Sequence, residues 1–479
     1  MRMDGNKPVV LLGVLLLSVA IYQVLHIYGA SGISWDFISH YLNAEALIHP
    51  QFYSSVRLVG YSVIVYNHGL YFEIGRAPLS SVILALLLLV SKPLAIELFI
   101  VFTFVLLFIA AFYIANELEI NPLLLEAFMF VPYVLSFIVL SDSEDVLSFA
   151  LLGVALLLLF RKSELSGLAL GLAGLAKYSA LIFLPLIFLL ASPKKVRNAA
   201  LLCILVTAPW LVFNTYYFGL PMFSYVADMS SGISLASPSL FSINYFAILE
   251  VLSYPLVGIA MAALALLFKK TNAKKRPLMH THGASIPGAP ARRKYYYAAI
   301  MSFLSLSVIG FLIVGQGKDA ITQMRYVSFL YLGVSVLSAF WMTNAYRSRN
   351  ASIFGREIDL ATLLSLAFFL GSLLMLVTFY GVPYVNAYAV LNGKGNSSLF
   401  ANVTRVLGAY GLSNRTVVSN AWPYLLYRNI SAYSTYYLNK TLMSYPLVLV
   451  SAGVGDYYID MGNYTLLYNS STFRIYAPR

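Results

Sequence analysis

Apolar runs of close to twenty residues recur along this chain, and they constrain its fold more than any other feature. The first run covers residues 9–27, and further runs cover 198–217, 246–268, 296–314, 325–343 and 358–380. Hydrophobic residues make up 60% of the 479 residues and charged residues only 10%. Such a chain would aggregate in water, whereas a bilayer accepts these runs as helices. The sequence predicts an α-helical multi-pass membrane protein with about 11 to 12 hydrophobic helices.

The formal net charge of +12 is concentrated in four loops between the apolar runs. Basic residues gather at 161–162, 194–197, 269–294 and 347–356. The positive-inside rule predicts that these loops and the N-terminus are cytoplasmic, with the basic loop 269–295 as the longest. We interpret the charge as a topology signal and as contact with anionic lipid, and not as a nucleic-acid surface. A cleaved signal peptide over the first run is the alternative for the N-terminus, although the run is long for one.

With that orientation, the loop 29–77 and the acidic loop 141–145 lie on the extracytoplasmic face, as does everything after residue 380. Residues 166–191 have basic flanks on both sides, so we predict a hairpin of two short helices with Lys177 near its tip. Three apolar runs lie between residues 78 and 140, yet an even number of crossings is required there. One of the three runs is therefore short, re-entrant or part of a broken helix.

The last hundred residues have a different composition, with shorter apolar runs. We expect a small extracytoplasmic α/β domain over 381–479, with a helix at 399–409 and strands at 416–419, 447–450 and 473–476. The segment holds a dense series of N-glycosylation sequons, at Asn396, Asn402, Asn414, Asn429, Asn439, Asn463 and Asn469. Their density supports an extracytoplasmic location if the host glycosylates such sites.

Polar residues in the first extracytoplasmic loop follow a helical spacing. Asp36, His40 and Asn43 lie one turn apart, so a helix places them on one face. Acids are scarce in this chain, which favours a site. The alternative is an amphipathic interfacial helix whose polar face meets water.

Three more groups are predicted on the same membrane face: Arg76, the acids of residues 142–145, and a cationic group that includes Lys177. Arg76 precedes the proline that begins the next apolar run, and it is a binding candidate or an interfacial anchor. Lys177 needs a polar cavity, an acidic partner or a route to the interface, because a lysine at mid-bilayer costs about 2.5–3.5 kcal/mol. The remaining candidates are the acids Asp142, Glu144 and Asp145 and the cationic loop residues Lys318, Arg325 and Tyr326. Cations and carboxylates together suit a substrate with a phosphate and an acceptor hydroxyl.

This layout resembles the GT-C superfamily of membrane glycosyltransferases, which includes protein O-mannosyltransferases and the aminoarabinose transferase of lipid A. The resemblance rests on a long first outer loop that opens with Asp36, on Ser141-Asp142 in a second outer loop, and on the 167–178 segment ending in Lys177-Tyr178. A late Arg325-Tyr326 and an outer C-terminal segment complete it. It covers the layout of residues 1–380, the expected catalytic module.

The resemblance implies transfer of a sugar, such as mannose, from a polyprenyl or dolichyl phosphate to a lipid, glycan or protein acceptor, with inversion. It implies that Asp36 is the general base, that Asp142 is the second acidic position and that Arg325 holds the donor phosphate. No Trp-Trp-Asp run is present after residue 380, which disfavours the oligosaccharyltransferase subtype. No cofactor is expected; a divalent metal stays open, with independence from metal favoured.

Two other classes of function remain as alternatives. A secondary transporter would also need buried charge, but transporters often consist of two similar halves, and this chain has no such repeat. A non-catalytic membrane subunit of a glycosylation complex would explain the sequons but would leave the outer acids without a role.

Overall fold

The computed structural model describes the helices, most of the short connections between them and a C-terminal sheet. The described residues are 7–31, 35–49, 57–58, 63–66, 70–73, 75–130, 143–190, 192–226, 245–272, 289–314, 327–346, 350–353, 356–378, 403–412, 417–419, 425, 430, 432–434, 448–451, 464–469 and 473–478.

Six helices among the described residues are long and apolar enough to cross a membrane. Five further apolar helical stretches are shorter. The protein is therefore mainly helical with six candidate membrane spans, and the predicted number of 11 to 12 hydrophobic helices is not confirmed. Breaks in apolarity explain where helices end and begin: one helix ends at Ser91, and the side chain of Asn121 caps the start of another. The helices with long apolar windows are α1 (Lys7–Ser31), α4 (Ala95–Glu117), α9 (Pro193–Phe218), α12 (Ala289–Val314), α14 (Ser328–Tyr346) and α15 (Leu360–Thr378).

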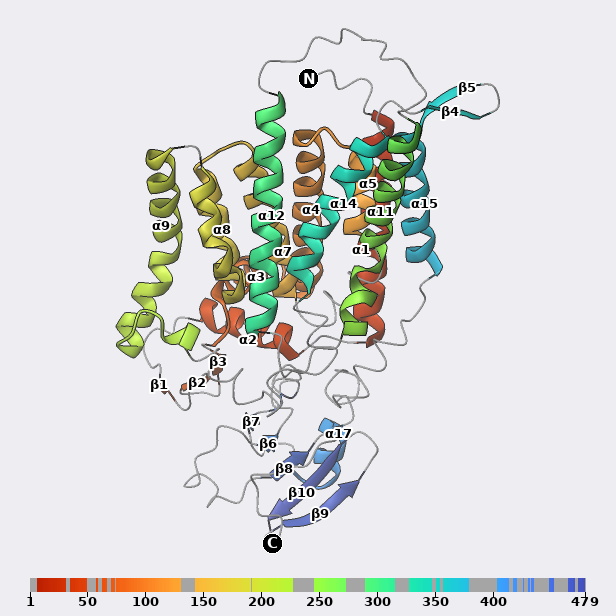
Figure 1. Ribbon diagram of the computed structural model, residues 1–479. Helices are drawn as coiled ribbons and strands as arrows, with labels where there is room; N and C mark the ends of the chain where they lie inside the picture. The colour runs from red at the N-terminus through yellow and green to blue at the C-terminus, as the bar shows by residue number, and fades with distance from the viewer. Residues whose placement is uncertain are drawn as a thin grey trace.

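The remaining helices lie between the long helices or across their ends. They are α2 (Trp35–Ile48), α3 (Pro78–Val90), the short 3₁₀ helix η2 (Lys92–Leu94), α5 (Pro122–Met129), α7 (Ser143–Phe160), α8 (Leu165–Ala176), the 3₁₀ helix η3 (Tyr178–Leu189) and α11 (Tyr245–Asn272). Figure 1 shows α2 across the lower ends of the long helices, on the side that also carries the C-terminal sheet.

The α7–α8–η3–α9 segment contains the predicted hairpin. A side chain at Gly167 would meet the backbone of Ala199, and one at Gly171 would meet Val206 and the backbone of Cys203. Equal steps along both helices mean that α8 and α9 run in the same direction. Since α8 and α9 start at the same end, η3 must return the chain, and Lys177 lies at the turn between α8 and η3. The predicted hairpin with Lys177 at its tip is confirmed.

Contacts fix the direction of the neighbouring helices. Gly153 of α7 approaches Ala110 of α4, and Arg161 after α7 pairs with Glu117 at the end of α4, so these two helices are also parallel. We call the end that carries Arg161, Lys162 and Lys195 the basic end. The tip end is the opposite one, where α7 begins and where Lys177 lies.

Helices α3 and α4 belong to the stretch between residues 78 and 140, where the number of membrane crossings could not be counted from the sequence. The hydroxyl of Ser81, near the start of α3, is 2.9 Å from His40 Nδ1 on α2, and Lys92 just after α3 pairs with Glu45 on α2 at 2.8 Å. Helix α3 therefore packs along α2 at the tip end, and α4 then runs to the basic end. Of the first two apolar runs, α3 lies along α2 while α4 extends from the tip end to the basic end.

Small sheets lie outside the helices. Strands β1 (Arg57–Leu58), β2 (Val63–Tyr66) and β3 (Leu70–Glu73) form an antiparallel sheet after α2, and β4 (Asn350–Ile353) pairs with β5 (Arg356–Asp359). The C-terminal sheet has the order β7-β6-β8-β10-β9 and is mixed, with β6 parallel to both neighbours and β10 antiparallel to both of its own. Its strands are β6 (Val417–Ser419), β7 (Ala432–Ser434), β8 (Val448–Ser451), β9 (Tyr464–Asn469) and β10 (Arg474–Pro478).

The C-terminal segment has its own apolar contacts. Helix α17 (Val403–Ala409) buries Val403 and Leu407, and Phe473 packs on Tyr468 with ring centroids 5.2 Å apart. The helix and the three strands expected from the sequence are present, and β7 and β9 are additional. An α/β character is therefore confirmed for this segment.

Candidate functional site

Helix α2 presents a buried polar face at the tip end of the bundle. His40 is fully buried and Asn43 is 2% exposed, and they are separated by one helical turn. A face that met water would leave these side chains exposed, so the interfacial alternative does not hold for them. Asp36 lies in the first turn of α2, one turn before His40, and its side chain lies outside the described residues.

Buried Ser81 on α3 fixes the His40 ring, since its hydroxyl oxygen lies 2.9 Å from the ring nitrogen Nδ1. A hydrogen bond at Nδ1 sets the orientation of the imidazole and leaves Nε2 to point the other way. Farther along α2, Glu45 pairs with Lys92, and His49 is exposed. Helix α2 therefore buries the face that carries His40 and Asn43, whereas Glu45 and His49 lie on the opposite, more exposed face.

A buried ion pair joins the start of α7 to the hairpin tip. Lys177 Nζ and Asp145 Oδ1 form a salt bridge, and their side chains are 9% and 1% exposed. Of the three acids predicted around this helix start, Asp145 is the one that the structure places in contact with a predicted cation. Glu144 lies in the first turn of α7 with its side chain outside the description, and Asp142 precedes the described part of this segment.

The tip is also tied to α9 and to the residues just before α3. The Tyr178 hydroxyl accepts a hydrogen bond from Trp210 Nε1 at 3.0 Å and donates one to the carbonyl oxygen of Arg76 at 3.4 Å. The backbone of Arg76 is therefore adjacent to the tip. The two bonds fix the Tyr178 ring in one position.

Aromatic side chains surround Tyr178 on the α9 side. Tyr225 packs edge-on against Tyr178 at 5.9 Å, and Trp210 stacks on Phe213 at 4.9 Å. Asn214, buried in α9, holds the return segment by accepting bonds from the backbone N–H and the hydroxyl of Ser224. Helix α9 continues from Trp210 to Phe218, about 12 Å at 1.5 Å per residue, so the tip stops short of the end of α9.

The arrangement offers a cation beside a carboxylate in a water-poor environment, with an imidazole and aromatic rings on adjoining elements. In such surroundings charged hydrogen bonds to an anionic group are strong. Within the part of the chain that the structure describes, no group of three or more His, Cys, Asp or Glu side chains could hold a metal ion. Metal independence stays a prediction, because the side chains of Asp36, Asp142 and Glu144 are not in that part.

Several predicted site residues fall outside the described residues. They are Lys318, Arg325 and Tyr326 in the connection before α14, and the acceptors Asn396, Asn402, Asn414, Asn429, Asn439 and Asn463. Asn469 is described: it ends β9, is exposed, and its side-chain oxygen accepts a bond from Arg474 Nε at 3.2 Å.

Sequence reasoning missed three residues that the structure makes prominent. Ser81 and Trp210 lie in apolar helices where nothing in the pattern singles them out. Glu126 is different, because it is an acid inside an apolar run, which is a recognised signal of a special role. It is 1% exposed and its carboxylate faces Gly13 of α1, where a side chain would collide with it.

Comparison with known proteins returned nothing for this chain: no protein family, no curated protein and no solved structure matches it.

Proposed function

We propose that this chain is an integral membrane glycosyltransferase that moves a sugar from a polyprenyl-phosphate carrier to an acceptor hydroxyl at the tip end. The observation that carries the proposal is the meeting of separate polar segments at that end. The buried face of α2, the residues before α3, the acidic start of α7 and the Lys177–Tyr178 tip belong to the segments on which the GT-C resemblance rests.

The chemistry follows from the charge of the leaving group. Polyprenyl phosphate departs as an anion, so its departure needs cations near the phosphate oxygens and not a general acid. Lys177 is our first candidate among the described cations of the tip end, and a phosphate that binds it would replace Asp145 as its partner. Arg325 and Lys318 are the further candidates for phosphate binding. The bond from the anomeric carbon to the phosphate oxygen breaks, and its electron pair leaves with the phosphate.

The acceptor needs a base on the opposite side of the anomeric carbon, since inversion requires in-line attack. Asp36 is our candidate: its carboxylate takes the hydroxyl proton while the acceptor oxygen bonds to the anomeric carbon. Placing Asp36 one turn before the buried His40 supports this role, because the polar face of α2 is then continuous. Trp35 and Tyr41 line the sugar pocket in this proposal.

The orientation belongs to the same proposal. We place the basic end in the cytoplasm and the tip end, with the C-terminal sheet, on the extracytoplasmic side of a cell membrane. Asn469, exposed at the edge strand β9, is the described acceptor for N-glycosylation. A glycosidase-sensitive gel shift lost in Asn469→Gln would place the sheet outside; an unglycosylated Asn469 in a host that glycosylates the other sequons would contradict its assignment.

The test of activity uses the full-length purified chain with a polyprenyl-phosphate hexose and measures release of polyprenyl phosphate. Asp36→Asn should abolish release while expression and unfolding temperature stay unchanged. Glu45→Gln is the matched control, because it makes the same carboxylate-to-amide change on the same helix, at the side chain that pairs outward with Lys92. Full turnover by Asp36→Asn would refute its role as base. Solute uptake by liposomes without sugar transfer would favour the transporter alternative.

A further inference from the structure

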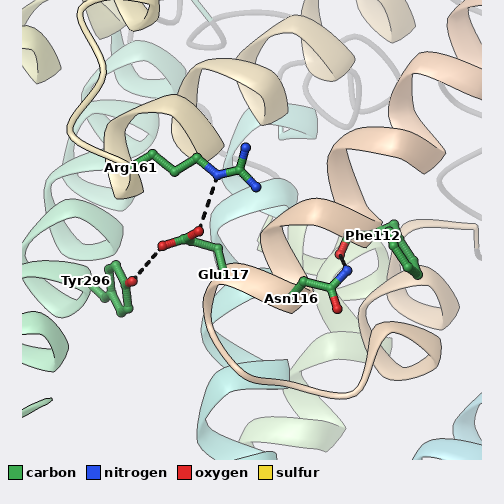
Figure 2. A network of polar contacts seen from close by, with 5 residues as sticks. All are labelled: Phe112, Asn116, Glu117, Arg161 and Tyr296. Atoms are coloured by element: carbon green, nitrogen blue, oxygen red, sulfur yellow. Dashed lines mark hydrogen bonds and ion pairs between the residues drawn. The ribbon is translucent and has the colours of Figure 1, made fainter. Parts of the chain in front are cut away.

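The basic end of the bundle contains an organised network that the proposed transfer reaction does not use. Arg161 Nε donates to Glu117 Oε2 at 3.3 Å, and the Tyr296 hydroxyl donates to Glu117 Oε1 at 2.9 Å. The network therefore joins the ends of α4 and α7 to the start of α12 (Figure 2). Both oxygens of Glu117 are engaged, so this carboxylate is held in one orientation.

The way in which Arg161 uses its donors is the unusual feature. It binds Glu117 through Nε, and Figure 2 shows the rest of its guanidinium on the side away from that carboxylate. The Arg161 guanidinium carbon also lies 5.6 Å from the centre of the Tyr113 ring, and the Arg161 side chain is 45% exposed. Two contacts thus orient the planar group and neither uses an Nη nitrogen, which is the geometry that binds a phosphate with two parallel hydrogen bonds.

Further cations are fixed beside Arg161. Lys162 lies over the Tyr295 ring at 4.8 Å, and Lys195 Nζ donates to the carbonyl oxygen of Lys162 at 2.7 Å. At the basic ends of α4, α7, α8, α9 and α12, the charged side chains that the structure describes are seven cations and three acids, a net charge of 7 − 3 = +4: Arg161, Lys162, Lys194, Lys195, Arg197, Arg293 and Lys294, against Glu117, Glu119 and Glu164. The environment of Arg161 favours an anion.

An apolar strip leads away from Arg161 along α4. Phe102, Ile109 and Tyr113 are 44%, 43% and 41% exposed and lie on one face of α4, at spacings of seven and four residues. The last of these is the ring that contacts Arg161. A soluble phosphate would make no use of this strip, whereas a phospholipid would place its acyl chain along the strip and its headgroup at the guanidinium.

We propose that the basic end binds the phosphate of an anionic phospholipid. The Nη pair of Arg161 clamps the phosphate oxygens, Lys162 and Lys195 supply further positive charge, and the exposed face of α4 accepts an acyl chain. The positive-inside rule demands only that cations lie on this side of the membrane. It does not demand an arginine oriented by a carboxylate and a ring above an apolar strip.

The experiment measures lipid binding to the full-length, detergent-purified chain by native mass spectrometry, with phosphatidylglycerol and phosphatidylcholine as the probes. Phosphatidylglycerol should bind more tightly, and Arg161→Gln should weaken it on the order of tenfold. Arg197→Gln is the matched control: it removes the same charge from an exposed position of the same end. It should leave the affinity within about twofold of the original.

Two outcomes would overturn the proposal. Equal losses in both variants would reduce the site to diffuse surface charge, and full displacement of the lipid by inorganic phosphate would make the ligand a soluble anion. If Arg161→Gln does not fold, Arg161→Lys decides, because it keeps the charge and loses the planar fork. Affinity retained in Arg161→Lys would contradict the two-bond clamp, and a clear loss would support it.

Discussion

The two ends of the helical bundle each contain a pair of a cation and a carboxylate, and the two pairs differ in burial. At the tip end, Lys177 and Asp145 are 9% and 1% exposed; at the basic end, Arg161 and Glu117 are 45% and 14% exposed. A buried pair depends strongly on both partners, because either one alone is an uncompensated charge in an apolar environment. An exposed pair loses little when water replaces a partner. Removal of one member of the tip pair should therefore destabilise the fold strongly, whereas removal of Arg161 from the basic-end pair should not.

The largest expected effect comes from removing one member of the tip pair. Lys177→Met leaves the Asp145 carboxylate buried without its cation and should destabilise the protein by about 3–5 kcal/mol. Chemical unfolding of the detergent-solubilised chain measures the loss. The double change Asp145→Leu with Lys177→Met removes both charges and should recover most of that stability.

The double variant also separates folding from function. If Lys177 binds the donor phosphate, a refolded double variant stays inactive in polyprenyl-phosphate release. A stable and fully active double variant would mean that the pair is structural only. Equal stability of Lys177→Met and the original chain would contradict the burial argument itself.

The second largest effect is expected from a substitution that disturbs the tip end and leaves every charged side chain in place. Gly167→Ala places a methyl group against the Ala199 backbone, which cannot yield as a side chain can, and should cost about 1–3 kcal/mol by pushing α8 off α9. Lys177, at the far end of α8, would shift with it, so release of polyprenyl phosphate should fall as well.

Gly310→Ala is the control for this change. A methyl group at Gly310 in α12 would find its nearest neighbour, Ile182 Cγ2, at an ordinary 3.5 Å, and alanine favours a helix over glycine. Its unfolding free energy should stay equal or rise. If Gly167→Ala behaved like Gly310→Ala, the close approach of α8 and α9 would be wrong.

These two regions also separate what the sequence could predict from what it could not. Lys177 at a hairpin tip followed from the basic flanks on both sides of residues 166–191, which require the chain to return to the side from which it entered. The choice of Asp145 as its partner did not, because three acids within four residues look alike until the rotation of α7 is known. The orientation of the Arg161 guanidinium could not be predicted from the sequence either, because it depends on how the ends of three helices pack together.

The position of α3 and the surroundings of Glu126 could not be predicted for the same reason: both depend on how the helices pack. Apolarity predicts that α3 avoids water, but a helix along the membrane surface and a short helix across the membrane share that composition. Only the contacts of Ser81 and Lys92 with α2 distinguish the two. Glu126 is a lone acid in an apolar run, and this pattern is as strong an indication of a special role as a lone lysine such as Lys177. Its position against Gly13 of α1 became visible only with the packing of α5.

A smaller effect is expected from the bonds that hold the tip in place. Tyr178→Phe removes the hydroxyl that links Trp210 to the Arg76 carbonyl, and each lost bond is worth about 0.5–1.5 kcal/mol. The ring contact with Tyr225 remains, so the fold should survive. Kinetics of sugar transfer should show a raised KM for the donor. Tyr225→Phe keeps the same ring contact and serves as control; equal KM values in the two variants would remove Tyr178 from the site.

The smallest effect is expected at the basic end. Arg161→Gln removes the cation from an exposed pair, and Glu117 keeps the hydrogen bond from Tyr296. The free energy of unfolding should change by no more than about 1 kcal/mol, and less at high salt, where exposed charges are screened. The measurement is the same unfolding experiment used for Lys177→Met, in a detergent without anionic lipid, so that lipid binding adds nothing. A loss as large as that of Lys177→Met would mean that the network of Figure 2 holds α4, α7 and α12 together, and the two ends would then differ in exposure but not in energetic importance.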